Sequence, residues 1–207
     1  MSKYEAILFD FDGVLVDSEP VHFECWQQIL KPFGLDLDWK TYLEEGVGIS
    51  DRAMLAMFCG RANPPLDIEL LVAEYPRKKD MFRAKMLANP AVSAEVVSLL
   101  DALSDFKLAV VSSSGRTEVE PILVAAGIRS RFETVVFGGD VRNLKPAPDP
   151  YLLAVDRLGV KRALVVEDSE AGETSGRAAG LDVLRVRNQQ EMPELLMAHL
   201  ETSIIAE

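Results

Sequence analysis

The sequence has few of the residues that build disulfide scaffolds or zinc sites. Its 207 residues include two cysteines, Cys25 and Cys59, and two histidines, His22 and His199. Two cysteines are too few for a disulfide framework, so we expect both to be free thiols packed in the interior, as is usual for intracellular cysteine. A zinc site is not expected, because the two histidines lie far apart in the sequence.

The sequence also lacks long apolar runs and an excess of positive charge. No run approaches the roughly 20 residues of a membrane helix, and the N-terminus carries no basic-then-apolar signal. The net charge is −11, whereas nucleic-acid binding needs a basic face. We therefore expect a cytoplasmic monomer without nucleic-acid or membrane partners. If such an acidic chain binds phosphate, it must build a local positive site from a metal, lysines or helix N-termini.

What the sequence does contain is a regular alternation of short apolar runs and helical segments. Strands are expected at 5–9, 107–111, 134–137, 163–166 and 182–186, and helices at 93–103, 117–126, 149–158, 171–179 and 192–200. This alternation predicts βαβ units and a parallel sheet. The apolar runs are continuous, as is typical of strands buried on both faces.

Between the first strand and this alternation, only helical patterns occur. They cover residues 24–33, 39–45, 50–60 and 67–87, with Pro76 marking a kink or a boundary between two helices. The predicted fold class is therefore α/β, with a Rossmann-like doubly wound parallel sheet and an inserted α-helical bundle. We assign residues 1–16 and 89–207 to the sheet domain and residues 17–88 to the insert.

Polar side chains follow the predicted strands where each one ends. They are Asp10 and Asp12 after the first strand, Ser112 after the second, Lys145 in the loop after the third, and Glu167 and Asp168 after the fourth. In an open parallel sheet, ligands bind at the carboxyl ends of the strands. Residues two apart in a strand share a face, so Asp10 and Asp12 are expected to point together. A turn role before Gly13 is the alternative for Asp12.

These residue types suit phosphoryl transfer. A carboxylate can attack phosphorus and form an aspartyl-phosphate, and Mg²⁺ prefers hard oxygen ligands. An anionic nucleophile that approaches an anionic phosphate needs neutralisation, because each unit repulsion at about 4 Å is worth roughly 4 kcal/mol at an effective dielectric near 20. A metal, lysines or helix N-termini would supply that neutralisation.

The order and spacing of these motifs resemble the haloacid dehalogenase (HAD) superfamily. The resemblance covers nearly the whole chain and rests on Asp10-Phe11-Asp12-Gly13-Val14, Ser112, Lys145-Pro146 and Glu167-Asp168. It implies that Asp10 is the nucleophile and a Mg²⁺ ligand, and that Asp12 is the general acid/base and a ligand through its backbone carbonyl. It also implies that Ser112 binds the phosphoryl group and Lys145 neutralises charge. Asp168 would ligate Mg²⁺, with Glu167 nearby through water.

Within that superfamily, the insert resembles the helical cap of the β-phosphoglucomutase and phosphoglycolate phosphatase branch. The similar segments are Ser18 to Phe23 with Trp26, Gly48-Ile49-Ser50, and Arg77 to Asp80. The resemblance implies that substrate is bound by Gly13, His22, Ser50, Arg52, Lys78, Ser113, Ser114 and Arg116. Plainer roles stay open: a hinge hydrogen bond for His22, cap core for Trp26, a surface position for Lys78, and helix caps for Ser113 and Ser114.

Two positions depart from the mutase pattern. Asp51 stands where the mutases have an arginine that grips a second phosphate, with Arg52 one residue later, and Arg116 replaces an asparagine. We therefore predict a Mg²⁺-dependent phosphatase of a small phosphorylated metabolite, a sugar phosphate or a phosphoglycolate-like ester. The alternatives are a β-phosphoglucomutase-type mutase and a receiver-like signalling module.

Overall fold

The computed structural model describes residues 3–47 and 49–205. The chain forms two compact units. The core unit comprises Met1–Asp17 and Asn89–Glu207, and the helical unit comprises Ser18–Ala88. The helical unit is thus an insertion that leaves the core unit after the first strand and returns to it before the second.

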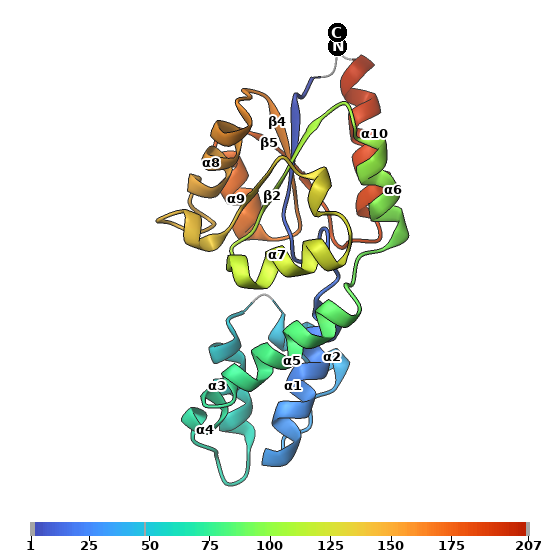
Figure 1. The fold of residues 1–207 in the computed structure, drawn as a ribbon. Helices are drawn as coiled ribbons and strands as arrows, with labels where there is room; N and C mark the ends of the chain where they lie inside the picture. The colour runs from blue at the N-terminus through green and yellow to red at the C-terminus, as the bar shows by residue number, and fades with distance from the viewer. Residues whose placement is uncertain (1–2, 48, 206–207) are drawn as a thin grey trace. The chain divides into compact units, whose positions relative to one another are not determined.

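The core unit is built on one sheet of five parallel strands (Figure 1). These are β1 (Ala6–Phe9), β2 (Lys107–Val111), β3 (Thr134–Val136), β4 (Ala163–Glu167) and β5 (Asp182–Arg185), in the spatial order β3-β2-β1-β4-β5. The central strand β1 is completely buried, which explains its unbroken apolar sequence. The predicted parallel α/β fold class is confirmed.

Helices cover both faces of this sheet. One face carries α6 (Ala94–Ala102) and α10 (Met192–Ile205), which pack side by side, and the other carries α8 (Asp149–Leu158) and α9 (Glu170–Ala178) (Figure 1). The helix α7 (Arg116–Ala125) follows β2, and short 3₁₀ turns occupy Arg129–Arg131 and Gly138–Asp140. Between α8 and the sheet lies an apolar cluster that includes Leu8, Val111 and Tyr151.

The strand register brings the predicted polar residues together. Phe9 pairs with Val110 on one side and with Val166 on the other. Asp10 therefore comes level with Val111 at the end of β2 and with Glu167 at the end of β4. The expectation that Asp10 and Asp12 share a strand face was wrong, because β1 ends at Phe9 and both aspartates lie in the turn that follows it.

The helical unit contains five α-helices within its described residues. They are α1 (Glu19–Leu30), α2 (Trp39–Thr41), α3 (Asp51–Arg61), α4 (Ile68–Val72) and α5 (Tyr75–Ala88), with a 3₁₀ turn at Lys31–Phe33 and a π-helical turn at Tyr42–Gly46. The first helix begins five residues before the expected start at 24, because Pro20 lies in its first turn, where a missing N–H costs nothing. Pro76 marks a boundary between helices rather than a kink.

An apolar core of its own stabilises the helical unit. Trp26, Leu55 and Phe58 are buried in it. Both cysteines are buried free thiols, as predicted. Within the described residues, no helix combines the length and the apolar character that crossing a bilayer requires.

The packing of α9 on the sheet yields a stability prediction. A Cβ atom on Gly176 would lie 2.8 Å from Val183 Cγ2 and 3.3 Å from Val165. Gly176→Ala should therefore lower the free energy of unfolding by about 1–3 kcal/mol through overpacking. The measurement is urea denaturation followed by circular dichroism.

The matched control is Gly60→Ala in the last turn of α3. Apart from its chain neighbours and the backbone of its own helix, no heavy atom lies within 4 Å of the added Cβ there. Alanine should be neutral or stabilise by up to about 1 kcal/mol, because it is the better helix former. Equal effects of the two substitutions would contradict the close packing of α9.

Candidate active site

The turn after β1 places Asp10 at the centre of the sheet edge. The Asp10 N–H donates to Val166 O at 3.0 Å, so the backbone is held to β4 one residue beyond the strand. The turn then closes through Gly13 N–H to Val16 O at 2.8 Å. Gly13 has φ +75°, and a Cβ atom there would overlap the Asp168 carboxylate. Glycine at this position therefore lets the turn lie directly against Asp168.

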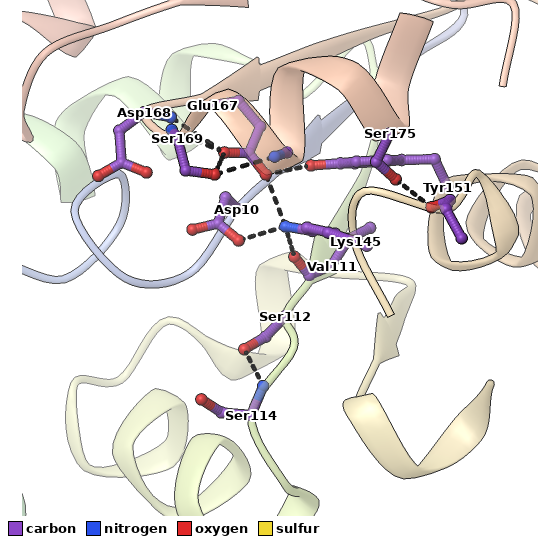
Figure 2. A network of polar contacts seen from close by, with 12 residues as sticks. Asp10, Val111, Ser112, Ser114, Lys145, Tyr151, Glu167, Asp168, Ser169 and Ser175 are labelled. Atoms are coloured by element: carbon purple, nitrogen blue, oxygen red, sulfur yellow. Dashed lines mark hydrogen bonds and ion pairs between the residues drawn. The ribbon is translucent and has the colours of Figure 1, made fainter. Parts of the chain in front are cut away.

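Lys145 is the central cation of the site (Figure 2). Its Nζ donates to Asp10 Oδ1, to Glu167 Oε1 at 2.6 Å and to Val111 O at 2.8 Å. The Lys145 side chain is 5% exposed, against 13% for Asp10 and 0% for Glu167. Burial opposes the charge on Lys145, but the Asp10 and Glu167 carboxylates raise its pKa above the ordinary value. The lysine is therefore an ammonium that joins two carboxylates.

Glu167 is saturated with hydrogen bonds. Its Oε1 accepts from Lys145 and from Tyr151 Oη at 2.7 Å, and its Oε2 accepts from the N–H groups of Asp168 and Ser169 and from Ser169 Oγ. Burial disfavours ionisation, yet the Lys145 charge and these donors hold the pKa of Glu167 below its ordinary value. On its remaining side, a Cβ atom on Gly172 would overlap the carboxylate.

Asp10 and Asp168 have the opposite electrostatic character. Burial raises the pKa of Asp168 to about 6, and the negative charges of Glu167 and Asp12 add to this effect. Burial also raises the pKa of Asp10, against the opposing charge of Lys145 and together with the charges of Glu167 and Asp12. Asp12 is thus close enough to act on both carboxylates. Lys145, with Arg185 acting on Asp168 as well, does not balance the four acids, so the site favours a further cation.

The acidic cluster can hold a metal ion. Asp10, Glu167 and Asp168 each present one carboxylate oxygen, and these oxygens lie within 4.8 Å of one another. Hard oxygen donors of this kind suit Mg²⁺. Because Glu167 already accepts five hydrogen bonds, Asp10 and Asp168 are the members of the cluster with capacity for direct coordination.

The serine loop after β2 lies beside this cluster (Figure 2). Ser112 is buried, its N–H donates to Val136 O, and its Oγ accepts from Ser114 N–H at 3.0 Å. Neither Ser113 nor Ser114 caps the next helix, because α7 takes Gly115 as its N-cap. Arg116 stacks on the Phe137 ring at 4.2 Å and lies 3.9 Å from Asp140. The structure does not bring Arg116 into the hydrogen-bond network of Lys145.

The helical unit gathers its own polar cluster around Lys78. This lysine is 3% exposed, with Nζ 2.7 Å from His22 Nδ1 and 3.5 Å from Asp51 Oδ2. It also lies 4.9 Å from the Trp26 ring centroid. Burial lowers the pKa of Lys78, while burial and the Lys78 charge lower the pKa of His22 to about 3. His22 is therefore neutral and accepts from the ammonium, and the surface role considered for Lys78 is wrong.

Three other residues of the helical unit have local partners. Ser50 Oγ accepts from Ala53 N–H and caps α3, and Arg52 forms a 2.5 Å ion pair with Glu69. Trp26 is buried in the unit's core, and its Nε1 donates to Asp51 at 3.2 Å. Gly48 lies outside the described residues. Arg52 is therefore paired with Glu69 and not with the cluster around Lys78. This pairing gives no sign that Arg52 takes the place of the mutase arginine for which Asp51 stands.

Comparison with known proteins decides the family. The model of the haloacid dehalogenase-like hydrolases matches residues 7–186, which is most of the chain. The chain belongs to this family. The resemblance seen in the motifs is thereby confirmed, and so is the expectation of an enzyme.

Individual relatives of the chain are phosphatases. It is 31% identical to the fructose-1-phosphate phosphatase YqaB of Escherichia coli over 192 residues, covering 89% of this chain and 97% of the relative. It is 30% identical to a phosphorylated carbohydrates phosphatase of Thermotoga maritima, covering 86% and 82%. The structure of a HAD-superfamily hydrolase of subfamily IA from Geobacter sulfurreducens superposes with a TM-score of 0.76 at 25% identity, covering 94% and 97%.

Sequence reasoning missed Tyr151 and Ser169. Tyr151 lies on the apolar face of α8, where its ring predicts only core packing, and its hydroxyl contact with Glu167 is 16 residues away in sequence. A polar atom on a face that is otherwise buried was the signal available, because a buried tyrosine hydroxyl usually finds a partner. Ser169 directly follows the strand-end acids Glu167 and Asp168, and its N–H and Oγ both donate to Glu167 Oε2.

The raised pKa of Asp168 predicts a pH-dependent effect on stability. The folded state binds this proton more tightly than the unfolded chain, whose carboxyl has an ordinary pKa near 3.8. Stability of the metal-free protein should therefore fall as the pH rises from about 4 to 6. Asp168→Asn removes the unfavourable charge and should stabilise the metal-free protein by about 1–3 kcal/mol at pH 7.5, with little effect near pH 4.

Denaturation in chelator at both pH values measures this difference. Asp156→Asn, on the exposed side of α8, is the control and should change stability equally little at each pH. Addition of millimolar Mg²⁺ should raise the melting temperature of the wild type more than that of Asp168→Asn. Destabilisation by Asp168→Asn in chelator at pH 7.5 would refute the electrostatic analysis.

Proposed function

We propose that the chain is a Mg²⁺-dependent phosphatase that hydrolyses a sugar monophosphate through an aspartyl-phosphate on Asp10. The observation that carries the proposal is the placement of Asp10 between the Lys145 ammonium and the Asp168 carboxylate at the carboxyl edge of the sheet. The phosphatase relatives support the substrate class, since their names specify fructose 1-phosphate and phosphorylated carbohydrates.

In the first step, Asp10 attacks phosphorus with the oxygen that Lys145 does not contact. Lys145 binds Oδ1 and so leaves Oδ2 for the new P–O bond. The ester P–O bond breaks, and Asp12 gives its proton to the departing sugar oxygen. Ser112 and Ser114 lie in the adjacent loop and are assigned to the phosphoryl oxygens. We also assign Ser113 and the backbone of Gly13 to binding of the phosphoryl group.

In the second step, water attacks phosphorus and releases Asp10. Asp12 takes the proton from this water, so it returns to the state that began the cycle, and inorganic phosphate leaves. Mg²⁺ bound by Asp10, Asp168 and the Asp12 carbonyl would neutralise charge on the phosphoryl group. This neutralisation also favours the ionised form of Asp10, whose pKa is raised in the metal-free protein.

The contacts of the helical unit favour a phosphatase over a mutase. We propose that this unit acts as the cap, and that His22, Lys78 and Asp51 meet the sugar end of the substrate. By the sequence resemblance, Asp51 stands where a mutase has its phosphate-gripping arginine, and its carboxylate is 45% exposed. Arg52 is paired with Glu69 instead. A second phosphate would be repelled there, so a monophosphate with an uncharged distal end is the proposed substrate.

The nucleophile assignment predicts loss of turnover in Asp10→Asn. The amide cannot form an acyl-phosphate, so kcat for p-nitrophenyl phosphate should fall at least about 10³-fold. Asp156→Asn is the control and should keep wild-type activity. The measurement is release of p-nitrophenol with saturating Mg²⁺. An Asp10→Asn protein that retains a tenth of the activity would exclude the covalent mechanism.

The assignment of Asp51 predicts a change of specificity. With fructose 1-phosphate and fructose 1,6-bisphosphate as a matched pair, the wild type should favour the monophosphate. Asp51→Asn keeps the size of the side chain and removes one like charge, which is worth on the order of 1–2 kcal/mol. The ratio of kcat/KM should shift about tenfold toward the bisphosphate.

Arg52→Gln is the control for this experiment and should leave the ratio unchanged. If Arg52→Gln abolishes use of the bisphosphate while Asp51→Asn does nothing, Arg52 rather than Asp51 faces the distal group. A parallel experiment analyses the products that the wild type forms from β-glucose 1-phosphate. Formation of glucose 6-phosphate without release of phosphate would favour the mutase alternative.

A further inference from the structure

We infer that Tyr151 is a positioning residue for the reaction, acting through Glu167 and Lys145 on Asp10. The inference rests on the proposed function. Tyr151 lies in the first turn of α8 and is completely buried, and its Oη donates to Glu167 Oε1 at 2.7 Å (Figure 2). It contacts neither Asp10 nor Asp168 by any hydrogen bond seen in the described residues. Its effect must therefore pass through Glu167.

The ammonium of Lys145 has three N–H groups and three acceptors. Asp10 Oδ1, Glu167 Oε1 and Val111 O take one each. Because every donor is used, the direction of each N–H is set by where the other two acceptors lie. A shift of Glu167 Oε1 would turn the ammonium and move the N–H that holds Asp10. The alignment of the nucleophile thus depends on the position of one buried oxygen.

Tyr151 is the neutral donor that fixes this oxygen. Glu167 Oε2 is held by groups of its own strand end, Asp168 and Ser169. Oε1 is held only by Lys145 and Tyr151 among the described residues. Without the phenol hydroxyl, Lys145 would be the remaining hydrogen-bond donor to Oε1 among the described residues. Oε1 and the ammonium could then shift together, and the ammonium would be oriented less precisely.

The surrounding structure makes Tyr151 a rigid support. Lys145 Nζ lies over the Tyr151 ring, 5.1 Å from its centroid, so the ring also packs against the ammonium. Ser175, on α9, is completely buried, and its Oγ donates to Ala147 O at 2.6 Å. This hydrogen bond fastens the short segment from Lys145 to Tyr151 to α9.

The test is Tyr151→Phe, which removes only the hydroxyl. Outer partners of this kind typically contribute about 10–100-fold to activity. We expect kcat for p-nitrophenyl phosphate to fall at least about tenfold. KM should stay within about twofold, because the substrate contacts are retained. The control is Tyr4→Phe, which also removes the hydroxyl of a buried tyrosine that donates to a carboxylate, Asp182, and should leave both constants unchanged.

A double-mutant cycle separates positioning from simple loss of stability. If Tyr151 acts through Glu167, Tyr151→Phe should have less than about a twofold effect on kcat in a Glu167→Gln background. The same factor in both backgrounds, or a wild-type kcat in the single variant, would overturn the inference. Failure of the proposed function would give different results. In that case the wild type would not hydrolyse p-nitrophenyl phosphate, or Asp10→Asn would hydrolyse it at the wild-type rate.

Discussion

The ion pair between Lys145 and Asp10 determines how the acidic edge of the sheet can be built. Four carboxylates converge at the ends of β1 and β4, and water screens their repulsion only in part, because Glu167 is buried and the three aspartates are partly buried. One buried ammonium, shared between Asp10 and Glu167, offsets part of that repulsion. It also distinguishes the two oxygens of Asp10, since only Oδ1 is engaged. Charge compensation and orientation of Asp10, the proposed nucleophile, therefore come from the same contact.

Backbone geometry allows this contact to form. The register of β1 with β2 and β4 sets Asp10 level with Val111 and Glu167, and Val111 supplies a carbonyl to the lysine. Two glycines then remove side chains where the carboxylates need space, Gly13 beside Asp168 and Gly172 beside Glu167. The site is thus specified by small residues and strand pairing as much as by its charged groups.

The sequence predicted the candidate site residues better than the residues that hold them in place. Asp10 and Asp168 were predicted because polar residues at the ends of apolar strands have few structural reasons to be there, whereas Lys145, in a loop, was predicted from the Lys145-Pro146 motif of the family resemblance. Local periodicity does not show the strand's last residue, so a strand face was favoured for Asp12 over the turn position that was considered as its alternative. The start of α1 was missed for a similar reason, since Pro20 suggests a loop although it suits a first helical turn.

Supports such as Tyr151 escape prediction because their partners are distant in the sequence. A tyrosine on the apolar face of α8 has the pattern of a core residue, and its ring does pack in the core. Only the fold shows that its hydroxyl meets Glu167. The helical unit gives a second case: Lys78 belongs to a charged run, yet it is buried against Trp26 with Asp51 as its carboxylate partner.

These two clusters illustrate different constraints on one enzyme. At the sheet edge, Glu167 has no free acceptor capacity and Lys145 has no free N–H, so a substitution there disturbs several contacts together. Around Lys78, Asp51 is half-exposed and bonded through single contacts to Trp26 and the lysine, so it can change without loss of the reaction chemistry. Under the proposed function, substrate choice can therefore vary at Asp51 while the residues proposed for phosphoryl transfer stay the same, so the motifs identify the reaction class more sharply than the substrate.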